Sequence, residues 1–145
     1  MQMHKTLPAG LYKNYIKFVY ELYKAGETGW AKKPTKQDID IFLKSASSHY
    51  FITHSGKIVA HAGYHKIYGN EKNAIIFIAV NKEYRRKGIG KRLVNFILKE
   101  GKRGGLSRMI AFVKKQNKAG KMFFSSCNFQ KLYDMELANV YAIDL

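Results

Sequence analysis

Residues 80–94 read Val-Asn-Lys-Glu-Tyr-Arg-Arg-Lys-Gly-Ile-Gly-Lys-Arg-Leu-Val, and this stretch indicates the fold more clearly than any other part of the chain. It follows the apolar run 74–80, which has the length and composition of a buried strand. It leads into apolar residues that recur at helical spacing. The pattern therefore predicts a strand, then a basic loop, then a helix that opens on the glycines at 88 and 90.

The basic loop and the glycines together predict a site for an anion. The start of a helix exposes unpaired backbone N–H groups and carries a partial positive charge. Glycines allow an anion to approach that backbone closely. Five cationic side chains lie around them in the sequence: Arg85, Arg86, Lys87, Lys91 and Arg92. A diphosphate is the anion that such a site fits most naturally.

Two common phosphate-binding motifs are excluded by single residues. The dinucleotide-binding fingerprint G-x-G-x-x-G would need a glycine where Leu93 stands. The P-loop needs Ser or Thr after Gly-Lys, but Arg92 follows Lys91, and Arg85 stands where its first glycine should be. The remaining alternative is a charged surface loop whose glycines simply begin a helix.

The rest of the chain is predicted to alternate between helices and strands. We expect helices at 11–24, 35–45, 88–100 and 117–127, strands at 50–53, 57–66, 74–80, 108–113, 129–135 and 138–144, and a polar turn at 68–73. The helix at 35–45 is expected to begin with a capping box between Thr35 and Asp38. Its buried stripe is expected to contain Ile39, Phe42, Leu43 and Ala46.

The order of these elements predicts the fold class. The strand–helix–strand unit that spans 74–113 is a crossover, so its two strands should lie parallel, while the hairpins on either side should be antiparallel. The expected fold is α/β in the mixed α+β sense, with a central, mostly antiparallel sheet and helices on both faces. The length of 145 residues corresponds to a single domain, 1–145.

Composition sets limits on the class of protein and on its partners. Lys and Arg number 26 against 10 Asp and Glu, and the net charge of +16 points to an anionic partner without naming it. A single cysteine excludes an internal disulfide, and Cys-based zinc sites need more thiolates. The longest apolar run is too short to span a bilayer, and the first residues lack the apolar stretch of a signal peptide. We expect a soluble, cytoplasmic protein with no membrane partner, as a monomer or a homodimer.

The basic loop resembles the acyl-CoA motif of the GCN5-related N-acetyltransferase (GNAT) superfamily. That motif is Gln/Arg-x-x-Gly-x-Gly/Ala, and Arg85-Arg-Lys-Gly-Ile-Gly90 matches it in full. A downstream family pattern of Asn, Ala, an aromatic pair and a final Phe is matched by Asn117, Ala119, Phe123-Phe124 and Phe129. The resemblance covers about residues 50–129. It implies the GNAT fold, in which the parallel strands splay apart to admit the cofactor.

The resemblance also implies acetyl-CoA (coenzyme A) as the cofactor and assigns residues to it. The edge at 78–80 would pair with the pantetheine arm, and the backbone N–H groups of 86–91 would hold the pyrophosphate. Asn117 would lie near the thioester end of the pantetheine. The implied cofactor-binding residues are Ile78, Ala79, Val80, Arg85, Arg86, Lys87, Gly88, Ile89, Gly90, Lys91 and Asn117.

The implied activity is that of an acyltransferase, an N-acetyltransferase that moves an acetyl group to a primary amine by direct attack in a ternary complex. The acceptor stays open: a small molecule, a peptide, a protein or an aminoacyl-tRNA. Two alternatives also stay open. One is a catalytically weak CoA-binding module with the GNAT fold. The other is an acetyltransferase associated with tRNA or another nucleic acid, because many lysines lie outside the motif.

The residues that would transfer protons are not assigned by the resemblance. Many family members carry a Tyr five residues before the final Phe as the general acid, and Phe124 stands at that position here. The loss should slow the reaction rather than abolish it, because a thiol of pKa about 8.5 leaves readily. Substitute acids are Tyr133, Tyr64 or Tyr141. Candidate bases are His61 and His65, which share one face of their strand and titrate near neutral pH.

Two other chemistries are disfavoured by the sequence. A metal site at the two histidines lacks an evident third ligand. Cys127 lies at a helix end with no obvious base, and a free cysteine is more often a small buried residue than a nucleophile.

Overall fold

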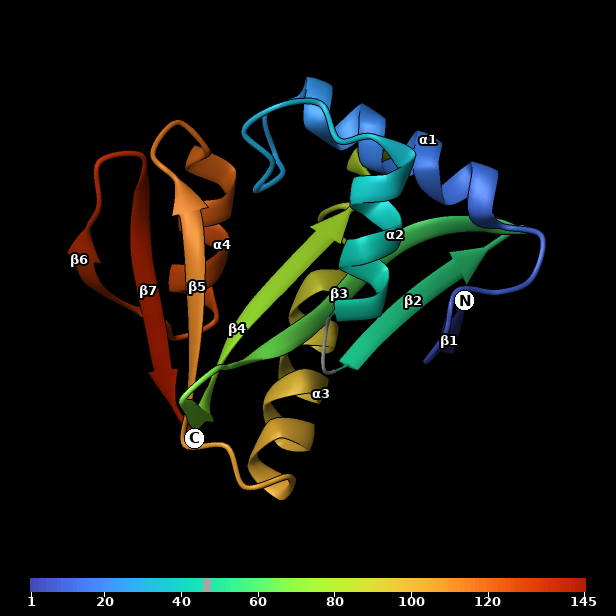
Figure 1. The fold of residues 1–145 in the computed structure, drawn as a ribbon. Helices are drawn as coiled ribbons and strands as arrows, with labels where there is room; N and C mark the ends of the chain where they lie inside the picture. The colour runs from blue at the N-terminus through green and yellow to red at the C-terminus, as the bar shows by residue number, and fades with distance from the viewer. Residues whose placement is uncertain (46–47) are drawn as a thin grey trace.

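The computed structural model describes residues 1–45 and 48–145, and over these residues seven strands form one sheet in the order β1-β2-β3-β4-β5-β7-β6 (Figure 1). The strands are β1 Gln2–His4, β2 Ser48–His54, β3 Lys57–Ile67, β4 Asn70–Val80, β5 Arg108–Lys114, β6 Gln130–Asp134 and β7 Ala138–Asp144. The helices are α1 Tyr12–Lys24, α2 Lys36–Ser45, the 3₁₀ turn η1 Lys82–Tyr84, α3 Ile89–Arg103 and α4 Lys118–Ser126. Within the described part of the chain, no helix has the length and hydropathy that crossing a membrane requires.

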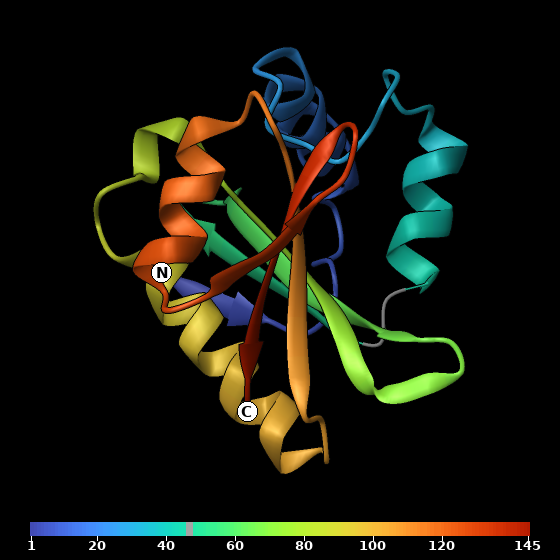
Figure 2. The same ribbon diagram turned by 90° about the vertical axis from the view of Figure 1, so that its left-hand side faces the viewer.

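The parallel pair predicted from the crossover is confirmed, and it is open at one end. Strands β4 and β5 are parallel, whereas the other neighbouring strands of the sheet are antiparallel. Their pairing runs from Asn73 opposite Arg108 to Ile75 opposite Ile110. Beyond these residues the two strands diverge, as Figures 1 and 2 show. The helix α3 connects them as the crossover.

Helices cover both faces of the sheet, as predicted, and each face has its own apolar core. On one face, α1 and α2 pack against β2 and β3 through a cluster that includes Tyr15, Ile39 and Phe51. On the other face, α3 and α4 pack through a cluster that includes Leu93 and Phe124 (Figure 2). The five most buried residues of α1 recur at helical spacing: Tyr15, Ile16, Phe18, Val19 and Leu22.

The start of α2 confirms the predicted capping box, but its buried stripe is narrower than expected. The Thr35 N–H donates to Oδ2 of Asp38 at 2.9 Å, and the Asp38 N–H donates to Oγ1 of Thr35 at 3.1 Å. Ile39 is buried, whereas Phe42 and Leu43 are half-buried. The predicted contribution of Ala46 lies outside the described residues.

The predicted polar turn at 68–73 is wrong, and one strand was missed. Only Tyr68 and Gly69 connect β3 to β4, and Gly69 adopts a φ of +82°, which a tight hairpin requires. The polar residues from Asn70 onward therefore pair as a strand that extends beyond the core. The missed strand, β1, pairs with β2 and is three residues long, too short for a pattern in the sequence to reveal it.

Candidate functional site

The end of β4 presents backbone groups toward the opening between β4 and β5. The Asn81 N–H donates to the Val59 carbonyl of β3 at 2.8 Å. Backbone groups alternate in direction along a strand. Because the Asn81 N–H points toward β3, the backbone groups of Val80 and Ile78 point away from β3 and toward β5. The described pairing with β5 has already ended at Ile75. This edge can therefore pair with an extended, amide-bearing ligand placed between the strands.

The loop after β4 is shaped to receive an anion. Arg86 has a φ of +63° and Gly88 a φ of +79°, and left-handed residues of this kind turn neighbouring N–H groups toward a common side. The Arg92 N–H donates to the Gly88 carbonyl at 3.1 Å. The preceding N–H groups of Ile89, Gly90 and Lys91 therefore have no acceptor within the helix.

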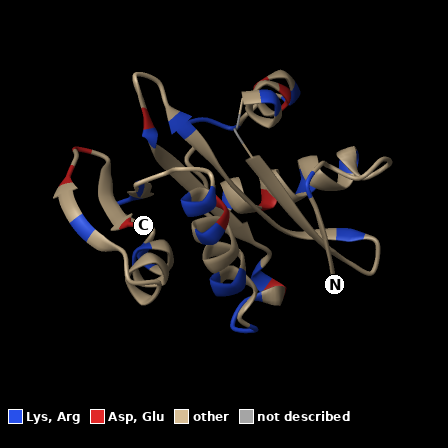
Figure 3. Cartoon of the chain, turned by 90° about the horizontal axis from the view of Figure 1, so that it is seen from below, with Lys and Arg blue, Asp and Glu red and all other residues tan. Residues whose placement is uncertain are grey.

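The charge of the same turn favours an anion. The first turn of α3 contains no acidic residue. Its cations Lys91 and Arg92 face the positive end of the helix dipole, which is unfavourable until an anion binds there. Lys and Arg residues occur along this loop and further along α3 (Figure 3). Among the described atoms, none lies within 4 Å of the position that a Cβ on Gly88 would take, so the backbone is accessible.

Three elements converge where α3 begins. A Cβ on Gly90 would lie 2.8 Å from a ring carbon of Phe123 and 3.7 Å from Cγ2 of Val80. The absence of a side chain at Gly90 therefore allows α4 to approach both α3 and the end of β4. On the β5 side of the opening, Asn117 caps α4, and its Oδ1 accepts a hydrogen bond from the Gly120 N–H at 2.9 Å.

The Arg85 side chain is held in place rather than free. Its Nε donates to the Val80 carbonyl at 3.0 Å, and its NH1 lies 2.5 Å from Oε2 of Glu27. On the other side of the opening, Nζ of Lys114 donates to the Trp30 carbonyl at 2.7 Å. The segment 27–30 between α1 and α2 is thus attached to both diverging strands. Sequence reasoning missed Glu27 and Trp30, because no local pattern pairs residues so far apart in the chain.

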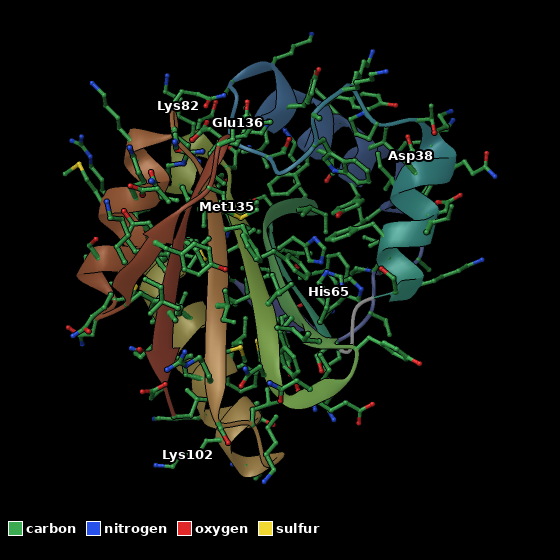
Figure 4. All side chains as sticks on the ribbon, turned by 60° about the vertical axis from the view of Figure 1, so that its left-hand side comes forward. Asp38, His65, Lys82, Lys102, Met135 and Glu136 are labelled. Atoms are coloured by element: carbon green, nitrogen blue, oxygen red, sulfur yellow. The ribbon has the colours of Figure 1, made fainter. Side chains whose placement is uncertain are left out.

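The two histidines proposed as bases share one face of β3, as predicted, and both lie beneath α2. The rings of His61 and His65 each contact Phe42 and Phe77 (Figure 4 labels His65). His61 is 3% exposed. Its Nδ1 lies 2.8 Å from the Tyr15 hydroxyl, and its Nε2 lies 2.9 Å from Nδ1 of His49. Both ring nitrogens of His61 are therefore engaged inside the core.

Burial also sets the protonation of these histidines. Desolvation, with a smaller contribution from the His49 ring, holds the pKa of His61 well below its usual value. Burial lowers the pKa of His65 as well, although the Ser45 carbonyl opposes the shift. We therefore expect both rings to be neutral at pH 7.

The remaining candidates lie in different parts of the fold. Tyr133 is 54% exposed on β6 at the edge of the sheet, which is separated from β3 in the strand order, so the structure does not bring it together with His61. Tyr64 and Tyr141 are buried in the core under α3. Phe124 is 6% exposed and packs between Phe123 and Phe129.

Cys127 caps the end of α4 and is half-buried. Burial raises the pKa of its thiol, and this outweighs the effects of Ser126 and Lys91. A raised thiol pKa disfavours the thiolate, in agreement with a packing role rather than a nucleophilic one.

The stability of the protein is expected to fall as the pH drops below about 6.5. The folded pKa of His61 is lower than its unfolded value, so the unfolded chain binds the proton first as the pH falls. Each pH unit between the unfolded and folded pKa then removes about 1.4 kcal/mol for this residue. Urea unfolding at pH 7.5, 6.5 and 5.5 measures the loss. His49 and His65 shift in the same direction.

A His61→Phe variant is the control for this pH dependence. Its ring can keep the stacking with Phe51, whose centroid lies 4.2 Å from that of His61, but it cannot take up a proton. We expect the variant to be less stable at every pH, because Tyr15 and His49 lose a partner, and to lose less stability on acidification. An equally steep pH dependence in the variant would contradict the assignment to His61.

Comparison with known proteins identifies the family. Residues 16–129 match the model of the Acetyltransferase (GNAT) family. No curated protein sequence matches the chain. The structure of a ribosomal-protein-alanine N-acetyltransferase from Brucella melitensis is similar, with a TM-score of 0.82 at 14% identity and full coverage of both chains.

Two further solved structures share the fold. A GCN5-related N-acetyltransferase from Kribbella flavida has a TM-score of 0.83 at 15% identity, over 99% of this chain and 97% of that one. A GNAT-family acetyltransferase from Staphylococcus aureus Mu50 has a TM-score of 0.79 at 15% identity, over 99% and 98% of the two chains. At these identities the solved structures show the fold, and the family model covers most of the chain. The chain therefore belongs to the acetyltransferase (GNAT) family.

Proposed function

We propose that this protein is an N-acetyltransferase that moves the acetyl group of acetyl-CoA to a primary amine by direct attack in a ternary complex. The observation that carries the proposal is the backbone edge at Ile78 and Val80. Its N–H and C=O groups point into the opening, beside the start of α3, where backbone N–H groups have no acceptor within the helix. The pantetheine arm of CoA contains amides that can pair with such an edge. Its pyrophosphate fits the N–H groups and cations of the adjoining loop.

The proposed binding residues have different tasks. The edge Ile78, Ala79 and Val80 would align the pantetheine, and the backbone from Arg86 to Lys91 would hold the pyrophosphate. The Arg85 side chain would act indirectly, because it already joins the Val80 carbonyl to Glu27. Asn117, on the β5 side, would place the start of α4 near the thioester end. When bound, acetyl-CoA supplies an activated acetyl thioester.

The chain's own contribution to the reaction would be mainly orientation. Holding the amine in line with the acetyl group, between strands attached to the same 27–30 segment, replaces a bimolecular encounter by an intramolecular one. Tyr133 and His65 remain the candidates for proton transfer, whereas both ring nitrogens of His61 are engaged within the core. Because Phe124 carries no hydroxyl, we expect turnover to lack the factor of about 10²–10⁴ that a general acid provides.

The acceptor is best sought among amines that are partly neutral at physiological pH. An α-amino group has a pKa of about 7.7–8.0, whereas a lysine amine has one of about 10.4. The Brucella structure is named for acetylation of a ribosomal-protein alanine, so a free peptide N-terminus belongs in the first panel of acceptors. A lysine peptide with a blocked N-terminus and a simple alkyl amine complete that panel.

The proposal predicts saturable acetyl-CoA binding and amine-dependent release of CoA. Calorimetric titration of the purified protein measures the first, and a thiol-reactive dye measures the second with each acceptor. The absence of saturable binding would overturn the proposal. Binding without amine-dependent release across the panel would favour the CoA-binding module instead, which the buried Phe124 makes the second candidate.

A further inference from the structure

The exposed face of α3 is almost entirely cationic. Its exposed residues are Lys91, Arg92, Asn95, Lys99, Lys102 and Arg103. The acidic residue of this helix, Glu100, is half-buried and lies 3.3 Å from Arg103. We call the six exposed residues the α3 face, and Figure 3 shows Lys and Arg along it.

The sequence segment that contains α3 carries most of the net positive charge of the chain. The segment 86–121 contains twelve Lys or Arg residues and one Asp or Glu, a net charge of +11 out of the total of +16. The remaining three quarters of the chain therefore carry a net charge of only +5. Lys118 and Lys121 of α4 belong to the same side of the sheet, because the start of α3 packs against Phe123.

The proposed cofactor does not account for the far end of the α3 face. Lys99 and Lys102 lie about 15 and 20 Å along the helix axis from Ile89, at a rise of 1.5 Å per residue. The Debye length at physiological salt is about 8 Å, so these lysines contribute little to an anion held at the helix start. Figure 4 shows Lys102 at the opposite end of the molecule from Lys82, which precedes the basic loop before α3.

Helix stability accounts for only part of the α3 face. Lys99 and Arg103 are four residues apart, a spacing at which like charges repel. In α1, by contrast, Lys17 lies 4.0 Å from Glu21 at the same spacing. Lys102 and Arg103 stand in the last turn of α3, where cations interact favourably with the helix dipole. The cations without a role in helix stability are therefore Lys91, Arg92 and Lys99.

We propose that the α3 face, together with Lys118 and Lys121, binds a nucleic acid through its phosphate backbone. From Lys91 to Lys102 the row of charges extends about 16 Å. One nucleic-acid strand places a phosphate about every 3.4 Å along its axis, so the row spans several phosphates. This inference is independent of the proposed acetyl transfer.

The same face disfavours a membrane surface as the partner. A membrane-surface helix needs an apolar face available to the lipid, whereas the apolar face of α3 is buried against the sheet through Leu93, Val94 and Ile97.

Among the described residues of α3 and α4, no aromatic side chain is exposed to stack on bases. Binding should therefore be independent of base sequence and similar for RNA and DNA.

The test compares two double variants that remove the same charge. Lys99→Gln/Lys102→Gln alters the α3 face. Lys36→Gln/Lys44→Gln alters two exposed lysines of α2, and Lys44 stands in the last helical turn as Lys102 does. Fluorescence anisotropy with labelled 20-nucleotide RNA and DNA of one sequence gives the affinity at several salt concentrations. Melting temperature and acetyl-CoA binding are measured for both variants, and we expect neither pair to change acetyl-CoA binding.

We expect the intact protein to bind both nucleic acids with an affinity that falls steeply with salt. The α3 variant should bind at least tenfold more weakly, with a salt slope smaller by about 1.4 for a single strand, while the α2 variant stays close to the intact protein. Absence of binding by the intact protein at 50 mM salt would overturn the proposal. Equal losses in both variants would overturn it as well, because they would reflect net charge alone. Lys99- and Lys102-dependent binding to vesicles containing phosphatidylserine, without binding to RNA or DNA, would replace it by a membrane surface.

Discussion

Replacement of Gly88 by Glu is expected to abolish measurable acetyl-CoA binding, with at least a hundredfold loss of affinity. Gly88 has a φ of +79°, and the position of its missing Cβ is open in the described structure. A side chain there costs about 1–2 kcal/mol of backbone strain. It also places a carboxylate where the structure offers N–H groups to a phosphate, so charge repulsion adds to the blocked approach. Calorimetric titration with acetyl-CoA measures the loss.

Gly105→Glu is the matched control. Gly105 has a φ of +90° and an equally open Cβ position, but it follows the far end of α3. The Gly105→Glu and Gly88→Glu variants therefore share the same backbone strain and the same added charge. Gly105, however, lies about the length of α3 away from the loop that contains Gly88. We expect this variant to bind acetyl-CoA like the unaltered protein. If Gly88→Glu also binds normally, the loop is not the pyrophosphate site.

Replacement of Gly63 by Ala is expected to lower the free energy of unfolding by about 3 kcal/mol, because it overpacks the core. The new Cβ would lie 2.6 Å from Cζ of Phe77 and would overlap the Ser48 carbonyl oxygen. The Phe77 ring crosses Gly63 to reach His49, His61 and His65. Either the ring or strand β2 must move. For a domain of this size, thermal unfolding should show a drop of about 6–12 °C in Tm.

Gly29→Ala serves as the control for this substitution. Gly29 lies between α1 and α2, and nothing described lies within 4 Å of its Cβ position. We expect a change in the free energy of unfolding within about 0.5 kcal/mol, as for most surface substitutions. If the Gly63→Ala and Gly29→Ala variants have the same Tm, the core accommodates the methyl group without strain.

Elements with strong local signals were predicted close to their observed bounds. The apolar part of β4, 74–80, was predicted from its composition, although the strand begins at Asn70, and α3 was predicted from the glycines and the helical spacing that follow. The Thr35–Asp38 capping box is likewise a local pattern, because its two hydrogen bonds join residues three positions apart. The turn at 68–73 failed for the opposite reason. Polar composition marks exposure, and the exposed end of a long hairpin is as polar as a loop.

By itself, the sequence determined the order strand, basic loop, helix and parallel strand, together with the charge and the glycines of the basic loop. The order of the elements depends on neighbours in the chain, so local propensity predicts it, and the crossover rule predicts the parallel pairing. The cofactor and the reaction were inferred from family resemblance.

The tertiary structure decided which of these residues are free to act. It holds Arg85 against Glu27 and encloses His61 between Tyr15 and His49. It also shows that the charges of α3 share one exposed face, while the opening between β4 and β5 is joined on both sides to one segment. Such contacts join residues far apart in the chain. Their geometry depends on how the two cores pack against the sheet, which no pattern within a single segment specifies.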